Sequence, residues 1–215
     1  MTEHEAWPGE DPAEEAEELA DDAAEADEVD VEPDEEEPIE EPRLRVAHQH
    51  VPGELDVPDD VDLLEGEARS TRRGVGVVVA RPNVDIVNRL LESALDELER
   101  AGLARDAVTV MAVPGPFELA LGAMALAKTR RYSCIVALGC IVRDETAQFE
   151  YVAGEAASGL QLAALETGVP VSFGVLTVES LAQAEARVDH GAGAVRNALE
   201  MADLFSQLRA AAHAQ

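Results

Sequence analysis

The chain has 215 residues, a formal net charge of −29 and a single lysine, Lys128. A chain this acidic lacks the clustered Lys and Arg side chains that neutralise phosphates, which argues against nucleic acid as a partner. No apolar run approaches the ~18 residues that cross a bilayer, and the N-terminus has no basic or apolar segment typical of a secretion signal, so we expect no membrane association and a cytoplasmic location.

The first third of the chain carries most of this charge. Residues 1–42 contain 21 Asp or Glu, no Lys or Arg, and five prolines. Such a segment cannot bury enough apolar surface to offset the entropy of ordering it, so we predict a disordered acidic extension that solubilises the protein or recruits a basic partner. We place this extension and its linker at 1–61, and one folded domain at 62–215.

The histidines and cysteines predict neither a metal site nor a disulfide. His48 and His50 stand in a segment rich in proline and acidic residues, which favours a flexible linker over a metal site. Cys134 and Cys140 fall six residues apart in one predicted strand, too far along an extended chain for a mutual disulfide. We therefore expect buried free thiols and no bound metal.

From residue 74 onward the pattern of apolar residues becomes regular. The segment "GVGVVVA" at 74–80 is a continuous apolar run, which is typical of a strand buried on both faces of a parallel sheet. Asn83 or Asp85 can cap the helix that follows, and Gly102 can end it. The first folded unit is therefore predicted to be a strand followed by an amphipathic helix.

The same unit then repeats along the chain. We predict further strands at 107–113, 133–142 and 169–177, and further helices at 117–128, at about 147–166 and from 179 to the C-terminus. Gly168 is expected to stop the helix that precedes it. Strands separated by helices of this length imply right-handed crossovers and a parallel sheet. The predicted fold class is α/β, a three-layer α/β/α sandwich of about four parallel strands.

Four segments fall at the edge of this sheet where strands end: "ARPN", "VPGPFE", "CIVRDETAQF" and "FGVLT". In open parallel sheets, ligands bind at this edge because loop amides and helix N-termini converge there. The sequence therefore predicts a binding cleft formed by these segments.

Individual residues of these segments have more than one interpretation. Phe117 and Glu118 fall in the first turn of a helix, where free N–H groups and a stacking ring could bind a ligand, although spacing alone favours a stiff turn with a core phenylalanine. Thr146 can cap the next helix, and Arg143 with Glu145 can form a surface ion pair.

Arg187 precedes a glycine-rich turn, where its guanidinium can clamp a phosphate, although an exposed arginine without such a role is commoner. None of these signals points to one family alone, but together and in this order along the chain they do. The segments "VPGPFELALGAMALAK", "ALGCIVRDETAQFEYVAGEAASGL", "LETGVPVSFGVLTVESLAQAEAR" and "ALEMADL" resemble those of the lumazine synthase family. The resemblance runs from about residue 62 to about residue 208 and leaves the acidic segment uncovered.

The resemblance implies a flavodoxin-like subunit that forms homopentamers, in some members sixty-subunit icosahedral capsids, with active sites between subunits. The implied reaction condenses 5-amino-6-(D-ribitylamino)uracil with 3,4-dihydroxy-2-butanone 4-phosphate to 6,7-dimethyl-8-ribityllumazine, without a cofactor. It also implies that the segment near "LLEGE" forms an N-terminal strand that pairs with a neighbouring subunit's sheet, which would cover an open edge.

The resemblance also assigns site residues to the predicted edge. The residues implied to line the pyrimidine and ribityl pocket are Pro82, Pro116, Phe117, Glu118, Cys140, Ile141 and Val142. The residues implied to hold the phosphate are Glu145, Thr146 and Arg187, and Phe173 is implied to close the pocket from the neighbouring subunit.

Four positions depart from the family's pattern. Gln148 stands where the family has a proton-transferring histidine, and Pro82 where it has an aromatic residue that stacks on the pyrimidine. Asp144 replaces a glycine, and Gly191 replaces a lysine. Glutamine cannot exchange a proton near pH 7, and a titrating group contributes about 10² to 10⁴ in rate. We therefore expect a synthase of reduced or altered efficiency, which works by holding its substrates together.

Other interpretations stay open at this point. His190 or Glu145 could supply a replacement base, although a lone loop histidine is more often solvated. A homologue without catalysis could act as a shell or scaffold whose acidic extension fills, solubilises or recruits. It could also be a binding protein for a flavin-like or lumazine-like heterocycle. The loss of both a stacking and a proton-transfer residue is what relaxed selection on catalysis would produce.

Overall fold

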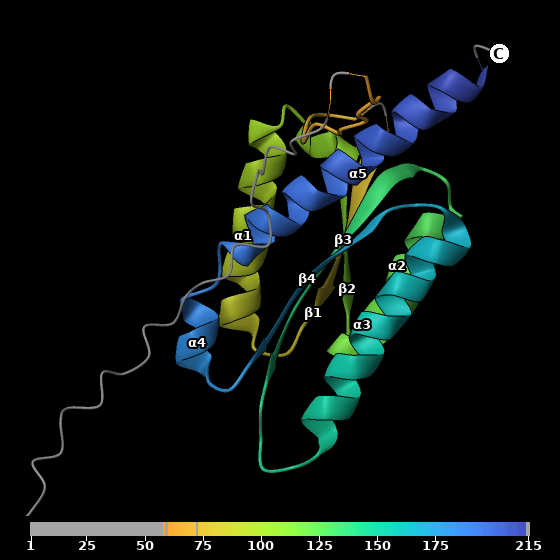
Figure 1. Cartoon of the computed structure of the whole chain (residues 1–215). Coiled ribbons are helices and arrows are strands. Elements are labelled where there is room, and N and C mark those ends of the chain that lie inside the picture. The colour runs from red at the N-terminus through yellow and green to blue at the C-terminus, as the bar shows by residue number, and fades with distance from the viewer. Residues whose placement is uncertain (1–57, 59, 72, 214–215) are drawn as a thin grey trace, which may run out of the picture. The chain divides into compact units, whose positions relative to one another are not determined.

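A computed structural model describes residues 58, 60–71 and 73–213 of the chain, so the acidic segment 1–42 and both linker histidines lie outside the described residues. The strands are β1 (Gly74–Ala80), β2 (Val108–Val113), β3 (Tyr132–Val142) and β4 (Val171–Val178) (Figure 1). The α-helices are α1 (Val84–Arg100), α2 (Leu119–Lys128), α3 (Gln148–Thr167), α4 (Leu181–Glu185) and α5 (His190–His213). Two 3-10 turns, η1 (Arg105–Ala107) and η2 (Pro116–Glu118), precede β2 and α2.

The strands form one parallel sheet in the order β2-β1-β3-β4. Ala80, the last residue of β1, pairs with Val113, the last residue of β2. On the other side of the sheet Val142 of β3 pairs with Val178 of β4. The strands therefore end at a common edge, and the predicted parallel α/β sheet is confirmed.

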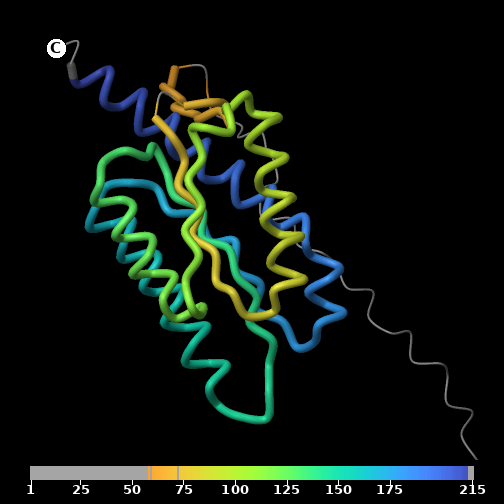
Figure 2. The backbone as a smooth tube through the Cα atoms, turned by 180° about the vertical axis from the view of Figure 1, so that it is seen from behind, coloured from red at the N-terminus to blue at the C-terminus, as the bar shows by residue number. Residues whose placement is uncertain are grey.

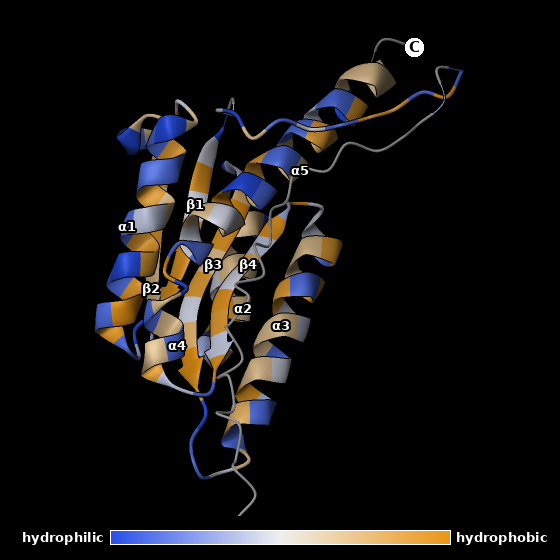
Figure 3. Cartoon of the chain, turned by 60° about the vertical axis from the view of Figure 1, so that its left-hand side comes forward, coloured by the Kyte–Doolittle hydropathy of each residue, from blue (hydrophilic) through white to orange (hydrophobic). Residues whose placement is uncertain are grey.

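Helices cover both faces of the sheet, with α1 and α5 on one side and α2 and α3 on the other (Figures 1 and 2). The central strand β1 shows how the sequence achieves this. Val75, Val77 and Val79 point into the α1/α5 layer, whereas Val78 and Ala80 point into the α2/α3 layer. Because both faces are buried, the strand is a continuous apolar run, and Figure 3 shows the strands as hydrophobic bands between the helices.

Two glycines end helices as the sequence predicted. Gly102 after α1 has φ 82° and Gly168 after α3 has φ 65°, a left-handed conformation that carries no Cβ penalty in glycine. The helix predicted at 117–128 is divided, because the Glu118 N–H donates to the Gly115 carbonyl in the i to i+3 pattern of a 3-10 turn. The α-helix α2 therefore begins at Leu119.

The segment before β1 lies against α5 and is fixed there by Asp203. The Asp203 carboxylate accepts the Glu67 backbone N–H at 3.1 Å and two Arg69 guanidinium N–H groups at 3.0 and 3.2 Å. The contact is close, since a Cβ at Gly66 would lie 2.2 Å from the Glu200 carbonyl oxygen. This segment is therefore part of the folded unit, and no strand is formed by its described residues within the single chain.

Candidate active site

Three turns follow the carboxyl ends of β1, β2 and β3 and lead into α1, η2 with α2, and α3. They are the turns 81–83, 114–118 and 143–147, and together they contain half of the predicted site residues. Because the strands are parallel, these turns share one edge of the sheet. Three of the four segments predicted at the sheet edge are therefore there, whereas the fourth, "FGVLT", lies inside β4.

Asn83 joins the first turn to β3. It adopts the left-handed conformation (φ 57°, ψ 49°), and its Nδ2 donates to the Cys140 carbonyl oxygen at 3.0 Å. Asn83 is the N-cap residue of α1, as one of the two predicted alternatives, but its side chain makes no capping hydrogen bond. The bond to Cys140 keeps the exposed Pro82 beside the carboxyl end of β3.

The second turn exposes an aromatic ring. Phe117 is 58% exposed, so it is not the core phenylalanine that spacing alone favoured. Pro116 begins η2 and is half-buried. The carboxylate of Glu118 folds back over Gly115, where an added Cβ would lie 2.9 Å from its Oε2 atom. The turn thus has an exposed ring and a half-buried carboxylate.

The end of β3 offers mainly backbone to this edge. Cys140 packs into the α1/α5 layer and Ile141 into the α2/α3 layer, while Val142 is half-buried. Burial raises the pKa of both thiols, that of Cys134 to about 12, so neither is a nucleophile near neutral pH. Both cysteines are free and buried, as predicted.

The third turn is organised by Asp144. Its Oδ1 accepts hydrogen bonds from the Thr146 backbone N–H at 2.9 Å and from the Thr146 hydroxyl at 2.7 Å. The bond from the Thr146 hydroxyl, followed by that from its N–H, lowers the pKa of Asp144, so the carboxyl is ionised. The Gln148 N–H donates to Thr146 Oγ1 at 3.3 Å, but the N-cap residue of α3 is Ala147 and no side chain caps the helix, so the prediction of Thr146 as the N-cap is wrong by one residue.

Arg143 holds this turn to its surroundings. Its guanidinium bonds to Glu150 of α3 and, at 2.8 Å, to Glu179 after β4, and it lies 4.2 Å from the centre of the Phe149 ring. The bond to Arg143 lowers the pKa of Glu150. The predicted partner was Glu145, which is exposed in the turn; that pairing is wrong because Arg143 reaches carboxylates on two other elements.

Gln148 is the first residue of α3, and its side chain is exposed at the edge. Of the other two site residues, Phe173 lies apart from the turns in this chain. Phe173 pairs with Ala137, five residues before the end of β3, which is about 16 Å along the strand. Arg187 follows α4, and its guanidinium donates to the Gln183 carbonyl at 2.8 Å. One chain therefore brings together the three turns but not Phe173.

His190 and Gly191 both pack inside the chain. His190 begins α5, its Nε2 atom is buried with no hydrogen-bond partner among the described residues, and burial lowers its pKa. The expectation of a solvated loop histidine is wrong, and a covered Nε2 atom cannot serve as a replacement base at the turns. A Cβ at Gly191 would lie 2.2 Å from the Leu90 carbonyl oxygen, so this position has no room for a lysine.

Two contacts of the site escaped prediction from the sequence. The Asn83 bond to β3 has no local signal, because its partner is 57 residues away. The Asp144 bonds do have one, since an Asp two residues before a Thr at a helix start is typical of an Asx turn. Across the described ranges of the chain, no three His, Cys, Asp or Glu side chains gather as a metal site, and no helix is long and apolar enough to cross a membrane.

The strand order and the three turns define the class of protein. An order of 2-1-3-4 with helices on both faces is that of flavodoxin-like α/β proteins, whose ligands bind at the carboxyl edge of the sheet. Residues 73–206 match the family model described as 6,7-dimethyl-8-ribityllumazine synthase. The chain belongs to this family.

Individual relatives agree with the family match. The chain is 43% identical over 155 residues to the 6,7-dimethyl-8-ribityllumazine synthases of Yersinia pestis (strain Pestoides F) and Yersinia pseudotuberculosis serotype O:1b (strain IP 31758). The matched region covers 69% of this chain and 99% of each relative. The similarity therefore spans almost the whole length of these relatives.

Proposed function

We propose that this protein is a 6,7-dimethyl-8-ribityllumazine synthase of reduced or altered efficiency that acts in riboflavin biosynthesis. It condenses 5-amino-6-(D-ribitylamino)uracil with 3,4-dihydroxy-2-butanone 4-phosphate and releases phosphate and water. The observation that carries the proposal is 43% identity over almost the full length of relatives named for this activity.

The exposed residues of the three turns support a division of the site between the two substrates. Phe117 and Pro82 provide apolar surfaces for the pyrimidine ring, and Glu118 provides hydrogen-bond acceptors for its polar edge. Glu145 and Thr146 lie at the N-terminal end of α3, a 20-residue helix whose dipole favours an anion such as the phosphate. Cys140, Ile141 and Val142 contribute through their backbone and through the position of the strand end.

Because position 148 is a glutamine and not a histidine, the protons of the reaction must move by another route. Imine formation, phosphate elimination and ring closure all move protons, and Gln148 can only donate and accept hydrogen bonds. We infer that Gln148 orients a substrate group or water, while protons pass through water or the substrates. Holding the amine and the ketone in contact is itself a large contribution to rate, so the reaction proceeds at a reduced rate.

We propose that the site is completed by a second copy of the chain within a homopentamer or a larger shell. The distance between Phe173 and the turns supports this, because a residue of one subunit can close the pocket of the next. Exposed apolar side chains support it as well, since Leu121 of α2 is 72% exposed and Leu165 of α3 is 75% exposed. In this arrangement Arg187 would bind phosphate across the subunit boundary.

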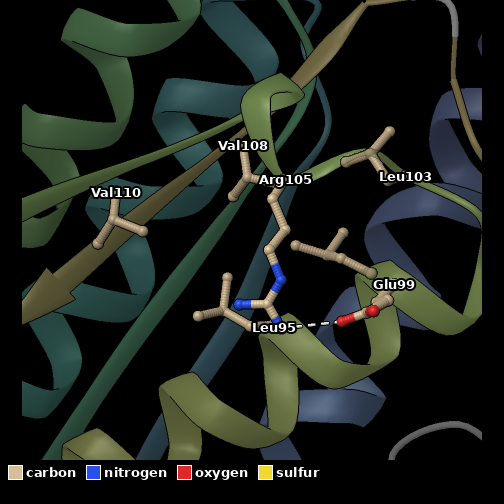
Figure 4. A pocket seen from close by; sticks show the side chains of 7 residues that line it. Leu95, Glu99, Leu103, Arg105, Val108 and Val110 are labelled. Carbon is tan, nitrogen blue, oxygen red and sulfur yellow. Dashed lines mark hydrogen bonds and ion pairs between the residues drawn. The ribbon is translucent and has the colours of Figure 1, made fainter.

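The edge strand β2 supports the same assembly. A pocket of about 190 Å³ lies between β2 and the end of α1 (Figure 4). Its lining residues are Leu95, Leu98, Glu99, Leu103, Arg105, Val108 and Val110. Val110 is 45% exposed on this open edge, where a neighbour's N-terminal strand near residues 63–67 would pair. We propose a cytoplasmic protein whose residues 1–61 form an acidic extension outside this assembly domain.

A second candidate function is favoured by one observation, that Gln148 cannot titrate at the position where proton transfer is expected. A shell or scaffold, or a protein that binds a flavin-like or lumazine-like heterocycle, would keep the apolar assembly surfaces and the exposed Phe117 without needing a base. Its acidic extension would then recruit a basic partner or cargo.

A time course with both substrates separates these functions. Product absorbance is followed for the unaltered protein, Gln148→His, Pro82→Phe/Gln148→His and the control Gln161→His, which changes an exposed residue about 20 Å further along α3. We expect product above the uncatalysed background in the unaltered protein, a gain of up to about 10² to 10⁴ in Gln148→His, and no gain in the control. If the unaltered protein forms product only at the uncatalysed rate and Gln148→His forms it faster, the result would instead support the scaffold or binding function.

A further inference from the structure

The carboxylate of Asp144 already occupies the best anion-binding donors of the third turn. One oxygen, Oδ1, takes both the N–H and the hydroxyl of Thr146, at 2.9 and 2.7 Å. These are charge-assisted hydrogen bonds, which are shorter and stronger than bonds between neutral groups. An anion that uses Thr146 therefore has to replace a carboxylate that belongs to the protein.

Of the three helix N-termini at this edge, that of α3 is the most favourable for binding an anion. The start of η2 and α2 has Pro116, which has no N–H, and its Glu118 N–H is bonded to Gly115. The first turns of α1 and α3 each have one acidic residue, Asp85 and Glu150, but Glu150 is bonded to Arg143. The start of α3 combines 20 residues of aligned peptide dipoles with the Thr146 hydroxyl. A phosphate that enters the edge is therefore drawn to the donors that Asp144 holds.

We propose that Asp144 is a specificity-determining residue that competes with the phosphate of the ketone substrate for the N–H and hydroxyl of Thr146. This inference rests on the proposed function, since it concerns the phosphorylated substrate of that reaction. Phosphate binds at Thr146 only when the Asp144 side chain rotates away, so the protein binds the phosphorylated ketone weakly. The pyrimidine is bound by the other two turns and is unaffected.

The charges around the turn increase this effect. Glu145, Glu150 and Glu179 add three carboxylates near Asp144, and the one cation of residues 143–150, Arg143, is already bonded to two of them. The displaced Asp144 carboxylate thus has no free cation in its own turn to pair with. Any cation that helps the phosphate has to come from another part of the assembly.

The test compares Asp144→Asn and Asp144→Gly with the control Asp106→Asn. Asparagine keeps the turn-forming side chain without its charge, whereas glycine removes both. Asp106 is an exposed aspartate in η1, before β2, at the opposite edge of the sheet. Calorimetry measures the Kd of inorganic phosphate in phosphate-free buffer, and steady-state kinetics measures KM for each substrate separately.

We expect both Asp144 variants to bind inorganic phosphate about tenfold more tightly and to lower KM for the ketone phosphate by a similar factor. KM for the pyrimidine, and all values for Asp106→Asn, stay unchanged. A purely structural role for Asp144 would raise both KM values together, which would overturn the proposal.

The proposal and the proposed function fail in distinguishable ways. If product forms but neither variant tightens phosphate binding or lowers KM for the ketone phosphate, the competition is refuted while the synthase function stands. If no protein forms product but both Asp144 variants bind phosphate more tightly than the unaltered chain, the competition stands and the synthase function fails. Absence of phosphate binding in every variant would also overturn the proposal.

Discussion

Substitution of Asn83 tests whether the bond between the first turn and β3 stabilises the site edge. Two properties of Asn83 can be separated, its left-handed backbone (φ 57°) and its hydrogen bond to the Cys140 carbonyl. Asn83→Gly removes the bond but tolerates the backbone conformation, whereas Asn83→Ala removes the bond and also places a Cβ in an unfavourable conformation. The pair of variants therefore isolates the cost of the backbone conformation.

The expected magnitudes follow from these two terms. Loss of the bond costs about 0.5 to 1.5 kcal/mol and applies to both variants. The left-handed conformation destabilises Asn83→Ala by a further ~1 to 2 kcal/mol. Asn83→Gly is destabilised by about 0.5 to 1 kcal/mol through another effect, because glycine gains more entropy on unfolding, and this offsets part of the difference between the variants. We therefore expect Asn83→Ala to be less stable than Asn83→Gly by about 0.5 to 1 kcal/mol, and both to be less stable than the unaltered protein.

The assay is thermal unfolding at a single protein concentration, because assembly makes Tm depend on concentration. For a domain of this size each kcal/mol corresponds to about 2 to 4 °C. If Asn83→Ala melts at or above the temperature of Asn83→Gly, the left-handed conformation is not maintained in solution. If neither variant melts below the unaltered protein, the bond to Cys140 contributes nothing to stability.

Two further predictions concern α5. Gly191→Ala should lower the free energy of unfolding by about 1 to 3 kcal/mol, because its Cβ would lie 2.2 Å from the Leu90 carbonyl oxygen. Gly193→Ala, where a Cβ meets nothing within 4 Å, should be neutral or slightly stabilising in denaturant titrations, and equal losses in both variants would contradict the packing. Burial lowers the pKa of His190, so the unfolded chain takes up a proton at a higher pH than the folded chain and stability should fall as the pH drops below about 6.5. In His190→Gln this part of the pH dependence of Tm should disappear, and an unchanged pH profile would show that His190 is not buried in solution.

The arrangement of strands and helices could be predicted from the sequence because its signals are local. The apolar run at 74–80 identified β1, since a strand buried on both faces needs no polar alternation. Gly102 and Gly168 marked helix ends because few other residues adopt a left-handed conformation at low cost. The clustering of the three turns followed from the parallel sheet alone.

The side-chain contacts of the site were harder to predict because their partners are distant in sequence. Arg143 was expected to pair with Glu145 two residues away, but it bonds to Glu179, 36 residues away, because β4 ends next to β3. His190 was expected to be solvated, since nothing in the neighbouring sequence indicates that the start of α5 is covered. Such contacts depend on which elements become neighbours, and short sequence patterns do not record that.

The contact between Asp203 and Arg69 also sets a time scale for the growing chain. The two residues are 134 positions apart. At about 5 to 20 residues per second, a ribosome needs about 7 to 27 s to synthesise the intervening chain. Until then the segment that precedes β1 lacks its anchor on α5. Synthesis of α5 therefore decides when this segment becomes part of the folded unit, and slower translation would lengthen the interval in which it is not anchored.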